Sequence, residues 1–149
     1  MSFKRKKING GVKGLLKRLE KSGKVNVGII DAGKHSDSGL TVAEVGNYNE
    51  FGTTRIPERT FMRSTIKEKR KEIVKLQEKL LKKMKSGEMN IDQALGLLGS
   101  FIAGEITQKI VNLKSPPNAP YTIKKKGSSN PLIGETGQLK NSITWEIDK

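Results

Sequence analysis

Two helical patterns follow one another in residues 60–112, which read TFMRSTIKEKRKEIVKLQEKLLKKMKSGEMNIDQALGLLGSFIAGEITQKIVN. In the first pattern, over residues 60–85, apolar side chains are spaced by three or four residues, or by sums of these steps, so that they form a stripe along one side of a helix. Only Lys69 interrupts this apolar stripe. A capping box at residues 90–93 opens the second pattern. Because a turn around Gly87 joins the two, the sequence predicts an antiparallel helical hairpin.

Shorter elements precede the hairpin. Residues 11–22 place apolar side chains at helical spacing, and residues 25–30 alternate β-branched residues as a strand does. A loop over residues 32–39, rich in Gly, Ser and Asp, leads to a second capping box at residues 41–44. That box predicts a short helix, which ends at Gly52.

The hairpin is flanked by less regular sequence. Residues 53–59 form a connector, after which Thr60 is expected to cap the first long helix. Beyond the hairpin, a proline-rich stop is followed by residues 121–126, predicted as extended or a short helix, and by one or two helical turns over 136–142. Residues 143–147 alternate as a strand. The predicted class is α+β, with a small antiparallel or mixed sheet packed against two long amphipathic helices.

The helix that ends the hairpin carries three glycines, Gly96, Gly99 and Gly104. Glycine weakens a helix unless another backbone approaches closely at that position. We therefore expect a close neighbour along this helix. Such a glycine-bearing helix and a long charged helix both suit contacts between different patches of identical subunits in a ring.

The net charge of +14 is concentrated in two blocks. Residues 1–24 hold nine Lys and Arg against Glu20 alone, and residues 60–90 hold ten against four acids. Residues 1–10 are predicted to be a flexible basic arm in front of a single α+β domain over 11–149. Such a charge favours polyanions, nucleic acid above all, although lysines also simply solvate a helix or an arm. The basic residues expected to contact DNA or an acidic partner are Lys4, Arg5, Lys6, Lys7, Lys13, Lys17 and Arg18.

Several kinds of chemistry are excluded or disfavoured. The chain has no cysteine, which excludes disulfides and thiolate sites. The single histidine, His35, lies in the Ser/Asp/Gly loop without ligand spacing around it. Asp31 and Asp37 flank Lys34 in the same loop, where turn chemistry explains them as well as cation binding does. No signal peptide and no membrane span of about 20 apolar residues is predicted. We expect no enzyme activity, no cofactor and no metal.

Two segments carry a family resemblance. Residues 48–63 contain Glu50-Phe51-Gly52 and then Ile56-Pro57-Glu58-Arg59-Thr60-Phe61, and residues 119–143 contain Pro131-Leu132-Ile133, Thr136-Gly137-Gln138-Leu139 and Ser142-Ile143. In order and rough spacing, over residues 25–147, the chain resembles the small tail-completion and virion-morphogenesis proteins of tailed bacteriophages. It departs from that pattern at Thr60, where the family often has proline, and by an inserted Gly-Glu before Thr136.

The resemblance implies a structural virion protein that forms a ring at the neck or upper tail, completes the tail and joins it to the head. A hexameric or dodecameric ring is expected, assembled in the host cytoplasm. Its partners would be copies of itself and the adjacent head–tail connector, tail terminator or tail tube proteins, with genomic DNA in the channel and no membrane.

The connector supplies most of the candidate interface. Phe51 and Phe61 are expected to pin it onto the core, and Arg55, Arg59 and Arg63 are placed to bridge to carboxylates of a neighbouring subunit. The residues expected at the subunit interface are Glu50, Phe51, Arg55, Ile56, Pro57, Arg59, Phe61, Arg63 and Trp145.

Two other functions compete with the ring. One is a free-standing basic nucleic-acid-binding protein, which the net charge favours, although no aromatic motif for base stacking lies on a strand. The other is a phage-encoded enzyme or nuclease, whose metal-dependent activity would be lost on mutation of Asp31 or Asp37.

Overall fold

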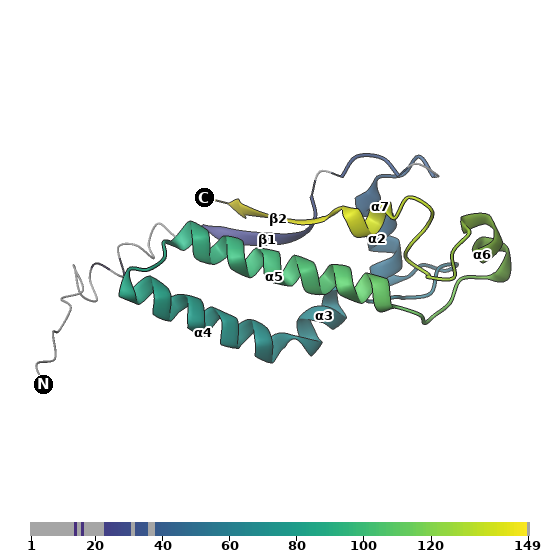
Figure 1. The fold of residues 1–149 in the computed structure, drawn as a ribbon. Coiled ribbons are helices and arrows are strands. Elements are labelled where there is room, and N and C mark those ends of the chain that lie inside the picture. Colours follow the sequence, from purple (N-terminus) through teal and green to yellow (C-terminus); the bar gives the residue numbers. More distant parts are fainter. Residues whose placement is uncertain (1–13, 15, 17–22, 31, 36–37, 149) are drawn as a thin grey trace, which may run out of the picture.

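Helix α5 (Ile91–Asn112) runs through the middle of the molecule, and two strands and three helices of the fold pack against it (Figure 1). The structure, a computed structural model, describes residues 14, 16, 23–30, 32–35 and 38–148. The predicted arm at residues 1–10 lies outside the described residues, and so does the predicted helix at 11–22 apart from Gly14 and Leu16. The seven basic residues expected to contact DNA or an acidic partner also lie outside them.

Two strands cover one side of α5. Strand β1 (Lys24–Ile29) pairs antiparallel with β2 (Ile143–Asp148), so that Lys24 lies opposite Asp148 and Ile29 opposite Ile143. Both strands contact α5 (Figure 1). The α+β class is confirmed, and the sheet is the antiparallel one of the two predicted alternatives.

The side of α5 away from the sheet is covered by α3 (Met62–Glu68) and α4 (Arg70–Ser86), with α4 antiparallel to α5 (Figure 1). Gly87 ends α4 in the left-handed conformation, with φ of 79°. The prediction of one unbroken helix over residues 60–85 was wrong, because the chain turns at Lys69 between α3 and α4.

The turn falls where the apolar stripe is interrupted. Lys69 cannot be buried as an aliphatic residue would be, and its Nζ atom instead pairs with Glu105 of α5 at 3.2 Å and with Glu72 at 3.1 Å. Hydrogen bonds to Glu72 and then Glu105 raise the pKa of Lys69. A half-buried ion pair therefore lies where the apolar stripe is interrupted, and α3 departs from the direction of α4 at this residue.

The described residues form three further helices: α2 (Val42–Phe51), α6 (Pro120–Lys126) and α7 (Gln138–Asn141). The capping box before α2 is confirmed, since Glu44 N donates to Thr41 Oγ1 at 3.1 Å and the Glu44 carboxylate accepts from Thr41 N at 2.8 Å. The Glu44 carboxylate also accepts from Thr41 Oγ1 at 2.8 Å, and the bonds from the Thr41 backbone N–H and hydroxyl lower the pKa of Glu44. The capping box at Asn90 and the helix end at Gly52 are confirmed as well.

The core has two parts along α5. The first lies where α2, α3, α7 and the second half of α5 meet, and its buried residues are Val42, Phe61, Ile106, Ile110, Leu113, Leu132 and Leu139. The second lies between α4 and the first half of α5, and its buried residues are Leu80, Met84, Ala94 and Leu98.

The glycines of α5 meet side chains rather than a backbone, which corrects the expectation above. A Cβ added at Gly99 would lie 2.7 Å from Val25 Cγ2 and 2.9 Å from Trp145 Cγ, and one at Gly96 would lie 3.1 Å from the Trp145 ring. Gly104 has nothing within 4 Å of that position. Two of the three glycines thus let the sheet, and Trp145 in particular, lie directly on α5.

Gly99 and Gly104 are expected to respond in opposite ways to alanine. Gly99→Ala pushes Val25 and Trp145 off α5 and should lower the free energy of unfolding by about 1–3 kcal/mol. Gly104→Ala adds a methyl group in open space and should raise it by about 0.5–1 kcal/mol through helix propensity. Urea unfolding of both variants at equal protein concentration measures the difference. A destabilising Gly104→Ala, or a neutral Gly99→Ala, would contradict this packing.

Candidate functional site

Glu50 caps the first turn of α3 from the last turn of α2. Its Oε2 atom accepts from the backbone N–H groups of Phe61 at 2.7 Å and Met62 at 2.9 Å, and Oε1 accepts from the N–H of Arg63 at 2.9 Å. The Arg63 Nε atom donates to the same Oε1 at 3.1 Å. The first N–H groups of a helix lack helical partners and favour a negative charge. The cap assigned to Thr60 is therefore wrong, because a carboxylate from α2 does this work.

Arg59 ties the connector to the loop that follows α5. Its Nε donates to the Pro116 carbonyl at 2.8 Å, and Nη1 donates to Asn49 Oδ1 at 3.0 Å. Its Nη2 donates to the Pro117 carbonyl at 3.1 Å and to Asn118 Oδ1 at 3.0 Å. Arg59 is only 4% exposed, and burial lowers the pKa of its guanidinium. The four acceptors replace the water that burial removes.

Three residues expected at a subunit interface are instead buried in their own chain. Glu50 is 4% exposed, Arg59 4% and Phe61 0%. The polar atoms of Glu50 and Arg59 are engaged within the chain, and Phe61 belongs to the first core cluster. The prediction that these three residues lie at the surface was therefore wrong. The prediction that Phe61 packs the connector onto the core is confirmed.

The remaining candidates of the connector stay at the surface. Phe51 is 58% exposed, so the expectation that it packs on the core was wrong; the Arg63 guanidinium lies 4.4 Å from the centre of its ring. Arg55 and Pro57 are exposed and Ile56 is half-buried. Trp145, 36% exposed, lies on α5 far along the chain from the connector. The structure thus does not gather the predicted residues into one patch.

The chain after α5, residues 113–134, forms a lobe that we call the α6 lobe. It is joined to the rest of the molecule by Leu113 and Leu132 in the first core cluster and by polar contacts. The side-chain amide of Asn130 donates to the carbonyls of Ile110 at 3.0 Å and Val111 at 2.9 Å, at the end of α5. The Asn118 amide donates to the Pro131 carbonyl at 3.2 Å. The Asn130 and Arg59 contacts join the lobe to the rest of the molecule, whereas the Asn118 bond lies within the lobe.

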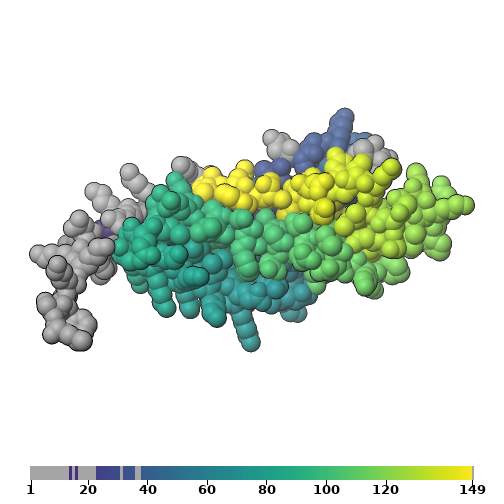
Figure 2. Space-filling model, viewed as in Figure 1, coloured from purple at the N-terminus to yellow at the C-terminus, as the bar shows by residue number. Residues whose placement is uncertain are grey.

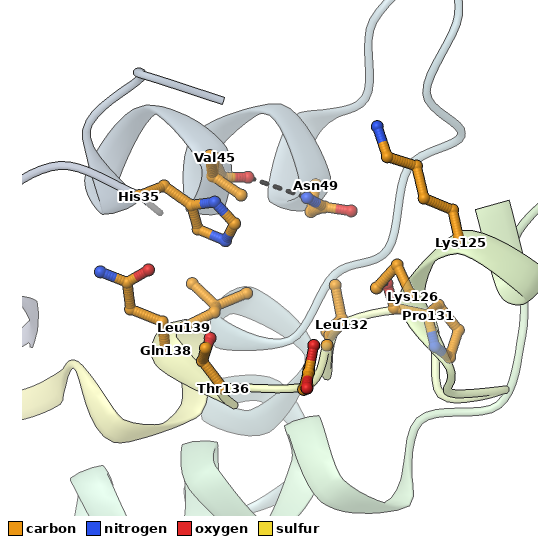
Figure 3. A pocket seen from close by; sticks show the side chains of 12 residues that line it. His35, Val45, Asn49, Lys125, Lys126, Pro131, Leu132, Thr136, Gln138 and Leu139 are labelled. Carbon is orange, nitrogen blue, oxygen red and sulfur yellow. Dashed lines mark hydrogen bonds between the residues drawn. The ribbon is translucent and has the colours of Figure 1, made fainter. Parts of the chain in front are cut away.

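A cavity of about 540 Å³ lies between α2, the α6 lobe and the residues around α7. Figure 3 shows His35 and Asn49 on one wall, with Gln138, Leu139 and Thr136 opposite and Lys125 and Lys126 at one end. The lining residues are His35, Val45, Asn49, Lys125, Lys126, Pro131, Leu132, Gly134, Glu135, Thr136, Gln138 and Leu139.

The cavity does not present a set of groups that we can assign to a reaction. Its ionisable lining consists of one imidazole, two ammonium groups and one carboxylate, Glu135. Within the described part of the chain, no three His, Asp or Glu residues are grouped to hold a metal ion. Asp31 and Asp37, the ligands of the nuclease hypothesis, lie outside the described residues.

Helix α5 has three faces, and only two of them are covered. The sheet lies on the face with Gly96 and Gly99, and α3 and α4 lie on the face with Leu98. Two of the three charged residues of α5 also turn toward α3 and Lys69: Glu105 pairs with Lys69, and Lys109 Nζ lies 2.7 Å from Glu68. The third charged residue, Asp92, lies in the first turn.

The third face of α5 is exposed and carries no charge. Its residues recur at steps of four and three, which places them in one line along a helix. They are Gln93, Leu97, Ser100, Gly104, Gln108 and Val111, and we call them the α5 face. Leu97 is 50% exposed and Val111 42%. In Figure 2 the side chains of α5 form a continuous band between β2 and the α3–α4 side.

The α5 face was missed by the sequence analysis, which followed the apolar stripe facing the core. The sequence feature that could have revealed this face is the absence of charge at these positions in a chain with 30% charged residues. With two apolar faces and an uncharged third one, α5 is by length and composition apolar enough to cross a membrane, a test that core helices also pass.

Comparisons with protein-family models, with curated proteins and with solved structures found no match to this chain.

Proposed function

We propose that the chain is a structural virion protein of a tailed bacteriophage, which forms a ring at the neck or upper tail, completes the tail and joins it to the head. The observation that supports this proposal best is the α5 face, an exposed helix face without charge on a protein with a net charge of +14. The proposed location of the ring, at the neck or upper tail, rests on the resemblance in residues 48–63 and 119–143.

The charge distribution favours a second copy of the chain as the occupant of the α5 face. Two copies with this net charge repel each other, and contact through α4 would bring its lysines together. A contact through the α5 face avoids this repulsion, because none of its residues is charged. Ser100 and Gly104 at its centre also leave room for the approach of another helix.

The internal contacts of Glu50 and Arg59 support a rigid subunit. Each side chain joins segments that are distant in sequence, and no buried side-chain N or O atom among the described residues lacks a hydrogen bond. A ring requires every subunit to present the same surfaces in the same geometry. Under this proposal the family-like connector holds the subunit in shape, and the α5 face is one of the two different patches that meet in each contact of the ring.

Lysine at position 97 is expected to break the ring. Leu97→Lys places an ammonium group in the proposed contact, and burying it without a partner should weaken self-association by about a hundredfold or more. Light scattering during size-exclusion chromatography and electron microscopy of the purified protein measure the assembly. The matched control is Leu81→Lys on α4, a leucine that is 37% exposed, which should assemble as the unchanged chain does.

A wild-type chain that stays monomeric at high concentration would overturn self-assembly, and equal effects of the two lysines would overturn the role of α5. The place in the virion has its own test. Infection by phage that lack the protein should give full heads and separate tails that do not join. Normal infectious particles without it would contradict a role at the head–tail junction.

A further inference from the structure

The α6 lobe lies at the end of the molecule where α5 ends (Figure 1). The C-terminal end of β2 lies at the opposite end. The residues of the lobe, 113–134, contain four lysines and no acid. The lysines are Lys114, Lys124, Lys125 and Lys126. Helix α4 carries more positive charge, with seven Lys and Arg, but Glu72 and Glu78 stand among them. The acid nearest to the lobe in sequence is Glu135, which lines the same cavity as Lys125.

Helix α6 divides its side chains into two faces. Thr122, Ile123 and Lys126 are half-buried, and Lys126 Nζ donates to the Pro131 carbonyl at 3.0 Å. The other face consists of Tyr121, Lys124 and Lys125, which are all exposed. Figure 3 shows the difference between the two neighbouring lysines: Lys126 lies against Pro131, and Lys125 extends away from it.

On the outer face of α6, the position of Tyr121 lies between those of Lys124 and Lys125. Residues at i, i+3 and i+4 are neighbours on a helix surface. Tyr121 is 77% exposed, the most exposed large apolar side chain among the described residues. Neither core cluster includes it, so its position is not explained by packing within the chain.

The lobe presents this face in a fixed position. Pro120 begins α6 and Gly127 ends it in the left-handed conformation, with φ of 64°. Arg59 and Asn130 then hold the lobe from two sides. Side chains that are held in place beforehand lose less conformational freedom when they bind.

We propose that Tyr121, Lys124 and Lys125 form a contact site for the phosphate backbone of duplex DNA. The two ammonium groups neutralise phosphates and release their counterions, and the tyrosine hydroxyl donates a hydrogen bond to a phosphate oxygen. Such contacts position a protein on DNA without reading its sequence. The site belongs to a single subunit, so it goes beyond the proposed ring and does not depend on it.

The test measures duplex binding by the full chain as a function of salt, using fluorescence anisotropy with a labelled duplex of mixed sequence. Lys124→Ala combined with Lys125→Ala should reduce the slope of log affinity against log salt by about 2. The control is Lys79→Ala combined with Lys82→Ala, which removes the same charge from exposed positions of α4 and should change the slope by much less. Tyr121→Phe should weaken binding about fivefold, as loss of one hydrogen bond does, without changing the slope.

Equal changes of slope in the two double variants would mean that only net charge matters and would overturn the site. An unchanged slope in the α6 variant would overturn it as well. Vesicles containing phosphatidylglycerol provide a further comparison, because a face for lipid would lose vesicle binding in the α6 variant and keep DNA binding. The Leu97→Lys variant separates this proposal from the ring, since it should lose self-assembly and keep the salt dependence that Lys124 and Lys125 contribute.

Discussion

Replacing Glu50 by alanine is expected to lower the free energy of unfolding by about 3–5 kcal/mol, the range seen when one partner of a buried charged network is removed. The carboxylate is 4% exposed and accepts hydrogen bonds from the backbone N–H groups of Phe61, Met62 and Arg63. Alanine leaves these donors without acceptors, and the one of Phe61 is buried. The start of α3 also loses its negative charge. Urea unfolding followed by circular dichroism measures the change.

Two further variants test whether the capping role is the cause. Glu50→Gln keeps the size of the side chain but puts an NH2 group where one carboxylate oxygen accepted, so it should still destabilise the protein by about 2 kcal/mol or more. Glu58→Gln is the control, because Glu58 also pairs with Arg63, at 2.8 Å, but is exposed. It should cost less than about 1 kcal/mol. A Glu50→Gln protein as stable as the Glu58→Gln protein would rule out the cap as a source of stability.

Replacing Arg59 by lysine is expected to lower the free energy of unfolding by about 3 kcal/mol although the charge is retained. The planar guanidinium reaches four acceptors, on Pro116, Asn49, Pro117 and Asn118, from three nitrogen atoms. A lysine has its donors on one nitrogen and cannot reach all four positions. At least two acceptors, which lie on half-buried or exposed residues, then lose a hydrogen bond to a charged group, at about 1.5–3 kcal/mol each.

Loss of the Arg59 contacts should also loosen the α6 lobe before the whole protein unfolds. Hydrogen exchange is expected to rise in residues 116–131 and to change little in α5. The matched control is Arg55→Lys, an exposed arginine of the same connector, which should stay within about 0.5 kcal/mol of the original chain. Uniform exchange in all segments of the Arg59→Lys protein would show that the lobe is not held through this side chain.

Local features of the fold could be predicted from the sequence because their causes lie within a few residues. The capping boxes at Thr41 and Asn90 and the helix ends at Gly52 and Gly87 are of this kind. The roles of Glu50 and Arg59 could not be predicted in this way. Glu50 acts 11 to 13 positions away, and Arg59 acts up to 59 positions away, so both depend on how the elements pack.

The sequence identified the unusual positions along the helices but not the residues that contact them. The sequence marked Lys69 as a break in the apolar stripe but not as the place where the helix turns, because its partner Glu105 lies in the next helix but one. The three glycines of α5 were expected to admit a backbone. Two of them instead admit Trp145, whose position depends on strand pairing between chain segments that are far apart.

The candidate site, like the fold, could be predicted only where its features are local in the sequence. The motif residues Glu50, Arg59 and Phe61 carry the family resemblance, but their burial depends on contacts that a motif does not reveal. The α5 face and the outer face of α6 are visible in the sequence as spacing and charge. They become candidates for binding only when the structure shows which faces of these helices remain uncovered.

The pairing of β1 with β2 has a consequence for biosynthesis. Asn26 of β1 and Glu146 of β2 are 120 positions apart, so during translation β1 emerges from the ribosome long before the strand that completes its hydrogen bonds. The same strand delivers Trp145 onto α5, whose sheet-facing side stays uncovered until then. A nascent chain therefore exposes an unpaired strand edge and an apolar helix together, the two features that invite aggregation and engagement by chaperones.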